Sequence, residues 1–181
     1  MPASPPLPAP PPATLPAFVG RQPIFDGRMG LVGYELLFRE DESNVAPPCV
    51  DGDSWTAQVV LNTFLDIGLD KVVGGHVAFI NATRAFLLER LALHLPPHRV
   101  VIEVLEHVAP DAEVLEAIHE LRGRGYVVAL DDFVLGSPAM AMVPLAGIIK
   151  VDISQVDQAT LQDYPRQLGA RGVRLLAGEP L

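Results

Sequence analysis

The sequence has little cysteine, little positive charge and no long apolar run. Cys49 is the only cysteine, which excludes an intrachain disulfide and a cysteine-built zinc site and suits a reducing, cytoplasmic setting. The chain carries 13 basic side chains against 22 acidic ones, a net charge of -9, which argues against binding DNA or RNA on an electrostatic patch. No apolar run approaches the roughly 18 residues that a membrane helix needs. We therefore expect neither a nucleic-acid partner nor a membrane one.

The prolines are concentrated at the N-terminal end. The segment from Met1 to Pro16 holds 8 of the 18 prolines, a composition that favours extended conformations and cannot bury a core. We predict a disordered tail over residues 1–16, with a proline-rich ligand for a partner as the alternative. The rest, residues 17–181, is long enough for one domain with a sizeable core.

Apolar periodicity predicts short strands that alternate with amphipathic helices. All-apolar strands between such helices are typical of parallel strands covered on their faces, so the predicted class is α/β. Pro165 is expected to shorten or kink the last helix. The expected elements are a hairpin over 18–38 with a turn at 26–27, helices over 53–68, 83–93, 111–125 and 159–168, and strands over 77–80, 99–104, 126–130, 147–151 and 173–177.

Two α/β architectures fit this pattern, a doubly wound open sheet and a (β/α) barrel. No Gly-x-Gly-x-x-Gly follows a strand and no Gly-x-x-x-x-Gly-Lys is present, so the nucleotide-binding open sheets lose support. A complete barrel takes at least about 200 residues. If the fold is a barrel, we expect it to be incomplete.

Polar residues end four of the apolar runs. Because the carboxyl ends of parallel strands gather at one face, we expect these side chains to converge there together with Glu35 from the hairpin. Their oxygens suit Mg²⁺ or Mn²⁺, and two such ions would polarise a phosphoryl group and activate a water, while Lys150 steadies the developing charge. Taken singly, each residue is equally a turn residue, a helix cap or a surface charge. The run-ending residues are Asn81, Glu103, Asp131, Asp132, Lys150 and Asp152.

Several motifs follow one another in a specific order. They are Gly20-Arg-Gln-Pro-Ile-Phe-Asp26, Gly33-Tyr-Glu-Leu-Leu-Phe-Arg39, Phe79-Ile-Asn81, Ile102-Glu-Val-Leu-Glu106, Leu130-Asp-Asp-Phe133 and Lys150-Val-Asp152. Together they resemble the EAL family of cyclic di-GMP phosphodiesterases. The opening motifs are similar to those of bacterial signalling proteins in which an EAL domain precedes an HDOD domain.

The resemblance implies a fold, a reaction and a set of residue roles. The fold is a TIM-like (β/α) barrel whose first strand is antiparallel to the rest, and the reaction opens cyclic di-GMP to the linear dinucleotide with Mg²⁺ or Mn²⁺. By position, Lys150 and Asp152 match the family's lysine and aspartate near the attacking water, and Arg39 matches an arginine that contacts a ligand phosphate. The implied metal ligands are Glu35, which is also the signature glutamate, Asn81, Glu103, Asp131 and Asp132.

The sequence also departs from the family pattern. The signature Glu-Ala-Leu is Glu35-Leu36-Leu37 here, which we expect to change the volume beside the metal site. Val134 replaces the first glycine of a Gly-Thr-Gly-like loop, where positive φ is expected. Glu179 falls one place later than the family's glutamate, and the chain ends at Leu181, before the last two barrel strands and any HDOD domain.

These departures shape the predicted function. We expect a C-terminally truncated EAL-type domain of cyclic di-GMP signalling, with weakened or lost phosphodiesterase activity. One alternative is a non-catalytic module that senses cyclic di-GMP or binds a protein, as a homodimer or with a signalling partner. The second alternative is a fragment of a longer EAL–HDOD protein.

Overall fold

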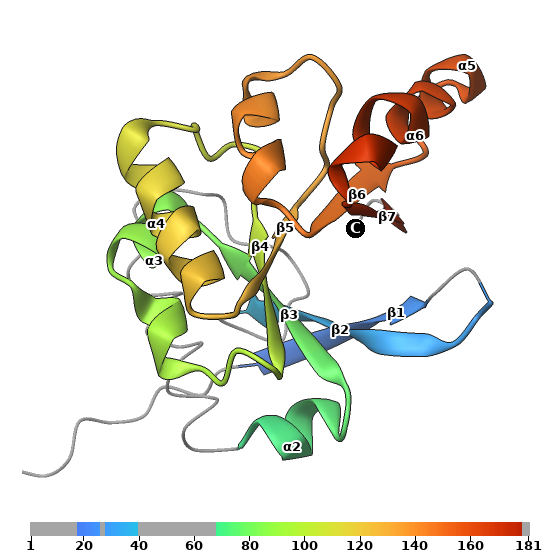
Figure 1. Cartoon of the computed structure of the whole chain (residues 1–181). Helices are drawn as coiled ribbons and strands as arrows, with labels where there is room; N and C mark the ends of the chain where they lie inside the picture. The colour runs from blue at the N-terminus through green and yellow to red at the C-terminus, as the bar shows by residue number, and fades with distance from the viewer. Residues whose placement is uncertain (1–17, 26–27, 40–67, 179–181) are drawn as a thin grey trace, which may run out of the picture.

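The computed structural model describes residues 18–25, 28–39 and 68–178 of the chain (Figure 1). The predicted tail, the turn at 26–27 and the predicted helix at 53–68, apart from its last residue, lie outside them. The strands are β1 (Phe18–Phe25), β2 (Leu31–Arg39), β3 (Val77–Ala82), β4 (Val100–Val104), β5 (Val127–Leu130), β6 (Ile148–Asp152) and β7 (Arg174–Gly178). The α-helices are α2 (Leu69–Val73), α3 (Arg84–Leu88), α4 (Ala112–Gly123), α5 (Gln158–Leu161) and α6 (Asp163–Leu168), and the 3-10 helices are η1 (Leu91–His94), η2 (Pro138–Ala141), η3 (Val143–Leu145) and η4 (Gly169–Arg171).

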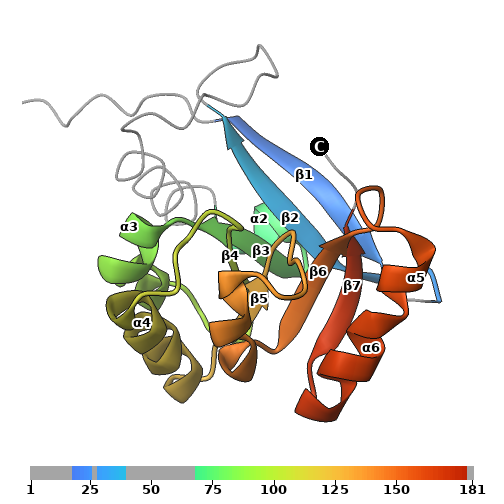
Figure 2. The same ribbon diagram turned by 90° about the horizontal axis from the view of Figure 1, so that it is seen from above.

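The strands form one sheet in the order in which they occur in the chain. β1 pairs with β2 in antiparallel fashion, and every later pair, from β2 with β3 to β6 with β7, is parallel. A doubly wound sheet reverses its strand order at a switch point, whereas here each new strand joins the same growing edge. The sheet curls, with α3, α4 and α6 along its outer side (Figure 2). The fold is therefore an incomplete TIM-like barrel whose first strand is antiparallel to the rest, as predicted.

Two apolar clusters occupy the two faces of this curled sheet. The larger lies between the sheet and the helices and joins Leu36, Ile80 and Ile102 of the strands to Ile118 of α4 and Leu168 of α6. Successive strand residues point to opposite faces, so their strand neighbours form the smaller cluster on the inner face. That inner cluster consists of Phe79, Val101, Ala129 and Ile148.

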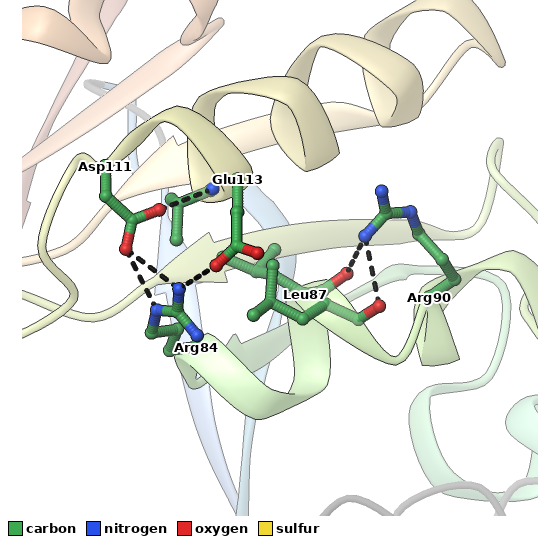
Figure 3. Close-up of polar contacts among 7 residues, drawn as sticks. Arg84, Leu87, Arg90, Asp111 and Glu113 are labelled. Carbon is green, nitrogen blue, oxygen red and sulfur yellow. Dashed lines mark hydrogen bonds and ion pairs between the residues drawn. The ribbon is translucent and has the colours of Figure 1, made fainter.

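The predicted helix over 83–93 is shorter in the structure. Its start is as expected, because the Thr83 hydroxyl accepts a hydrogen bond from the Phe86 amide. α3 ends at Leu88, however, and the chain continues as a 3-10 helix after Arg90, which has a left-handed φ of +58°. The Arg90 guanidinium donates to the carbonyls of Leu87 and Leu88 at 3.2 and 3.0 Å and so caps the end of α3 (Figure 3).

Charged side chains join α3 to α4. Asp111 caps α4 as predicted, accepting from the Val114 amide at 2.9 Å, and also accepts from Arg84 (Figure 3). Arg84 pairs with Glu113 as well, while Arg90 contacts Glu120 at 2.7 Å. These pairs are partly exposed, so we expect them to orient the two helices more than to stabilise the domain.

The structure alters two further predictions, those for the last helix and for Gly68. The last predicted helix is divided at Gln162 into α5 and α6, with Pro165 in the first turn of α6, where proline is tolerated. Gly68, expected to end the helix before it, has φ +83° and lies directly before α2, an element that we did not predict. No helix within residues 68–178 is long and apolar enough to cross a membrane.

The helix-facing cluster allows a test of the fold. Ile118 of α4 is fully buried there, so Ile118→Ala should lower the free energy of unfolding by about 2–5 kcal/mol through lost burial and a cavity. Glu116→Ala, on the exposed side of the same helix, should change it by less than about 0.5 kcal/mol. Urea unfolding followed by circular dichroism measures both, and equal losses would contradict this placement of α4.

Candidate active site

On β3 to β6, the inner face of the sheet changes from apolar to polar over two residues along each strand. Two residues beyond the inner apolar cluster, adjacent strands carry polar groups: Asn81 follows Phe79, and Glu103 follows Val101. The same spacing places Asp131 after Ala129 and Lys150 after Ile148, and Asn81 lies directly opposite Glu103 in the sheet register. The inner apolar cluster is thus the floor beneath a polar layer, which consists of Glu35, Asn81, Glu103, Asp131 and Lys150.

Lys150 is the centre of the polar layer. Its Nζ lies 2.9 Å from Glu35 Oε2, 2.6 Å from Glu103 Oε1 and 2.9 Å from Asp131 Oδ1. Glu103 is fully buried, and Lys150 and Glu35 are nearly so. Four different strands or strand ends therefore meet at one ammonium group, and the predicted convergence of these residues is observed.

The single Lys150 ammonium cannot neutralise three carboxylates in this buried layer. Burial, reinforced by the Glu35 and Asp131 carboxylates, raises the pKa of Glu103 to about 8, although Lys150 opposes this shift. Burial alone would lower the pKa of Lys150, yet the three surrounding carboxylates raise it above its ordinary value. At neutral pH the layer thus retains the Lys150 proton and holds a proton on Glu103 much of the time.

Several oxygens of this layer lack a hydrogen-bond donor. Asn81 donates from Nδ2 to Glu35 Oε1 at 3.4 Å, but its buried Oδ1 accepts nothing. Neither carboxylate oxygen of Glu103 receives an aligned hydrogen bond, even though Oε1 is close to the lysine. Buried polar atoms rarely lack a hydrogen-bond partner. Unpaired oxygens on neighbouring strands are the donor set that a hard divalent cation prefers, so these residues fit a metal ion.

The ligand set is not, however, arranged as a ready-made metal cage. Within the part of the chain that the structure describes, no three histidine, cysteine or acidic side chains are placed so that together they could hold a metal ion. The Lys150 ammonium lies among the carboxylates instead. Metal binding would therefore have to displace Lys150 from at least part of this contact.

The Asp131-Asp132 turn directs two carboxylates in different directions. Asp131 is bound through its amide to the Val104 carbonyl at 2.9 Å and reaches Lys150, whereas Asp132 is exposed and has a left-handed φ of +41°. Partial desolvation of its carboxyl group by the residues around the turn, with the nearby carboxylates of Asp131 and Asp152, raises the pKa of Asp132. We expected the unusual φ at Val134, which lacks the family glycine; that expectation is wrong, because the turn has its positive φ at Asp132 and again at Gly136.

Asp152 is held by the residues that follow it. Its Oδ1 accepts from the Ser154 amide and hydroxyl at 2.8 and 2.7 Å, and its Oδ2 accepts from Gln155 Nε2 at 2.5 Å. These hydrogen bonds, with that of the Ser154 hydroxyl first, hold the pKa of Asp152 below its ordinary value. The sequence reasoning missed both partners, although a serine two residues after an aspartate is the pattern of an Asx turn.

A cavity of about 480 Å³ opens beside the polar layer. Of the predicted site residues, Asp131, Asp132 and Asp152 line it, and its apolar walls include Phe133 and Val156. Prediction from strand ends could not find the residues between the strands that complete the lining, which are Glu106, Val134, Ser137, Ala139 and Gln155. Arg39 ends β2, but its side chain lies outside what the structure describes.

The leucine in the signature motif does not lie beside the polar layer. Leu36 is buried in the helix-facing cluster, on the opposite face of β2 from Glu35. Leu36 therefore fills space in the core between sheet and helices, and the expectation that it changes the volume beside the metal site is wrong. At the other end of the site, Gly178 lies opposite Asp152, and Glu179 is outside the described residues.

Similar proteins were found both by sequence and by structure. The chain is 36% identical over 157 residues to the cyclic di-GMP phosphodiesterase CdgJ of Vibrio cholerae, a match that covers 87% of this chain and 36% of that protein. PaMucR phosphodiesterase in complex with c-di-GMP superposes with a TM-score of 0.67 at 20% identity, covering 89% of this chain and 84% of that one. Klebsiella pneumoniae BlrP1, in a manganese and cyclic di-GMP complex, gives 0.67 at 20% identity, covering 92% and 50%. No protein-family model matches the sequence.

These comparisons identify the fold of the chain and a relative in sequence. The incomplete barrel, with its first strand reversed and its polar layer at the strand ends, has the fold of EAL domains. By its fold the chain is an EAL-type domain, and in sequence it is similar to the cyclic di-GMP phosphodiesterase CdgJ along 87% of its length. It spans just over a third of the length of that relative, at 36%. The predicted HDOD branch stays a prediction.

The buried Glu103 predicts a pH dependence of stability. Its pKa is about 8 in the folded chain against an ordinary value of 4.5, so between these values only the folded state retains the proton, and stability falls as the pH rises through this range. Glu103→Gln removes that titration. The unfolding free energy of the variant should therefore gain on that of the unmodified chain from about pH 5 to about pH 8. Urea unfolding in EDTA measures the difference, and a pH-independent difference would contradict a protonated Glu103.

Proposed function

We propose that this chain carries the site of a divalent-metal-dependent phosphodiesterase for cyclic di-GMP. The single observation that supports the proposal best is the buried polar layer, in which Asn81 and Glu103 keep unpaired oxygens beside Glu35 and Asp131. The likeness to CdgJ and the cyclic di-GMP complexes of EAL-fold proteins supply the substrate class. Mg²⁺ or Mn²⁺ is the proposed ion.

The proposed metal ligands are Glu35, Asn81, Glu103, Asp131 and Asp132. A bound ion would polarise a phosphoryl oxygen and lower the pKa of a bound water below that of free water. Oxygen-only ligands suit Mg²⁺ and Mn²⁺ equally, so the choice between them is part of the test.

Lys150 and Asp152 take distinct roles in this proposal. Because the carboxylates around it raise the pKa of Lys150, it stays protonated and acts as a fixed positive charge near the scissile phosphate, not as a base. Asp152 stays ionised because Ser154 and Gln155 donate to it, so it can accept a hydrogen bond from the attacking water and orient it. Arg39, at the end of β2, is proposed to contact a phosphate of the ligand.

The cavity beside the polar layer suits a dinucleotide with flat bases. Its apolar walls, Phe133 and Val156, lie near the Asp131-Asp132 turn and can pack against a ring. An anionic ligand would be repelled by these carboxylates and by the net charge of -9 unless a cation lay between them. The proposed ions thus act in binding as well as in hydrolysis.

A second candidate function rests on the position of Lys150. Its ammonium contacts three carboxylates at 2.6–2.9 Å and so partly neutralises the ligand set without any metal. That arrangement favours a module that binds cyclic di-GMP or a signalling partner without chemistry. The two candidate functions differ at Lys150: metal-dependent hydrolysis requires the carboxylates to release it in part, whereas metal-free binding does not.

Hydrolysis is tested by incubating the chain with cyclic di-GMP and Mg²⁺ or Mn²⁺ and separating the linear dinucleotide by chromatography. Glu35→Ala should reduce product formation by at least about 100-fold, because it removes both a proposed metal ligand and a Lys150 partner. Glu116→Ala, a surface change on α4, is the matched control and should leave the rate unchanged. Absence of product from a folded, unmodified chain would reject the phosphodiesterase proposal.

Chelation separates the two candidates. Because the site and the chain are acidic, affinity for cyclic di-GMP should fall by at least about tenfold when EDTA removes divalent ions. Isothermal titration calorimetry with and without Mn²⁺ measures this. Equal affinity in EDTA would overturn the metal-bridged model and support the metal-free binding module.

A further inference from the structure

The Asp131-Asp132 turn is held at fixed points on both sides. On the N-terminal side, the Asp131 amide donates to the Val104 carbonyl of β4 at 2.9 Å. On the C-terminal side, the Phe133 amide donates to the Lys150 carbonyl of β6 at 2.9 Å. Asp132 lies between these points with φ +41°, a conformation that persists in a non-glycine residue only where the surroundings fix it.

Tyr164 of α6 supplies a third fixed point. Its hydroxyl donates to the Phe133 carbonyl at 2.9 Å, and its ring meets the Phe133 ring edge-on with centroids 6.3 Å apart. Tyr164 is 1% exposed, so a phenylalanine would bury the same ring and lose only the hydroxyl. The amide and the carbonyl of Phe133 are thus both hydrogen-bonded, the amide to β6, which carries Lys150, and the carbonyl to α6.

We propose that Tyr164 is a positioning residue for the Asp131-Asp132 pair. Its hydroxyl fixes the carbonyl of Phe133, the residue after the pair, which maintains the left-handed Asp132 and so keeps Asp131 directed at Lys150 while Asp132 lines the cavity. The consequence for metal affinity rests on the proposed function above, whereas the consequence for the turn itself does not. Groups that orient metal ligands without touching the ion commonly change metal affinity by about 10–100-fold when removed.

The chain offers a matched control in Tyr126. Its hydroxyl is also buried and donates to two carbonyls, those of Ala92 and Leu95, at 2.8 and 2.7 Å, remote from the polar layer. Tyr126→Phe therefore removes a comparable hydroxyl from the same core without touching the turn. Any general loss of stability should be similar in the two variants.

The test compares Tyr164→Phe with Tyr126→Phe in the 181-residue chain by two readouts. The first is amide hydrogen exchange at Phe133, measured by NMR relative to the amide of Ala78 near the start of β3, which donates to the Arg99 carbonyl. The second is the dissociation constant for Mn²⁺ by calorimetry. Tyr164→Phe should speed Phe133 exchange several-fold relative to Ala78 and raise the Mn²⁺ dissociation constant by about tenfold. Tyr126→Phe should do neither.

Each other outcome has a defined meaning. If the two variants behave alike, or if Phe133 exchanges faster while Mn²⁺ affinity is unchanged, the hydroxyl does not position the pair and the proposal is overturned. If the unmodified chain itself does not bind Mn²⁺, the metal site of the proposed function is rejected, and the exchange ratio at Phe133 alone decides the role of Tyr164.

Discussion

The contact between one ammonium and three carboxylates organises this domain. Lys150 draws side chains from β2, β4 and the end of β5 to a single point on the inner face of the curled sheet. Moving Lys150 away would leave three largely buried carboxylates without their counter-charge, so the strands that carry these residues must keep their register relative to one another. The geometry of the candidate site and the curvature of the sheet are therefore one constraint.

The register provides this convergence through strand periodicity. On β3 to β6 an apolar residue of the floor is followed two positions later by a polar one. Asn81 lies opposite Glu103 in the register, whereas Glu103 lies opposite Ala129 and Glu35 opposite Phe79, so the polar groups converge from staggered positions on neighbouring strands. The floor keeps water from reaching the layer from below, which strengthens every interaction among the charges above it. The raised pKa of Glu103 follows directly from this desolvation.

Much of this arrangement was predictable because it depends on period and on strand ends. The hairpin, the parallel strands, the Asp111 cap and the convergence of Glu103 with Lys150 all follow from short-range patterns. The left-handed residues Arg90 and Asp132 were not predictable, because tertiary partners hold them: Glu120 contacts Arg90, and the bonds on either side of Asp132 fix the turn. The cavity lining was missed for a similar reason, since Ser137 and Gln155 come from loops whose path depends on the packed core.

The two faces of β2 also differ in how freely their residues can change. Glu35 belongs to the polar layer and forms an ion pair with Lys150, whereas Leu36 is constrained by the volume available between the sheet and the helices. Adjacent residues of one signature motif are thus under separate constraints. The residue at position 36 can be substituted, with compensating changes in the helices, without affecting Glu35. A motif defined by consecutive residues therefore scores Leu36 as a departure from the family pattern. A motif defined only by the residues on the inner face of the sheet does not include Leu36, and by that measure β2 does not depart.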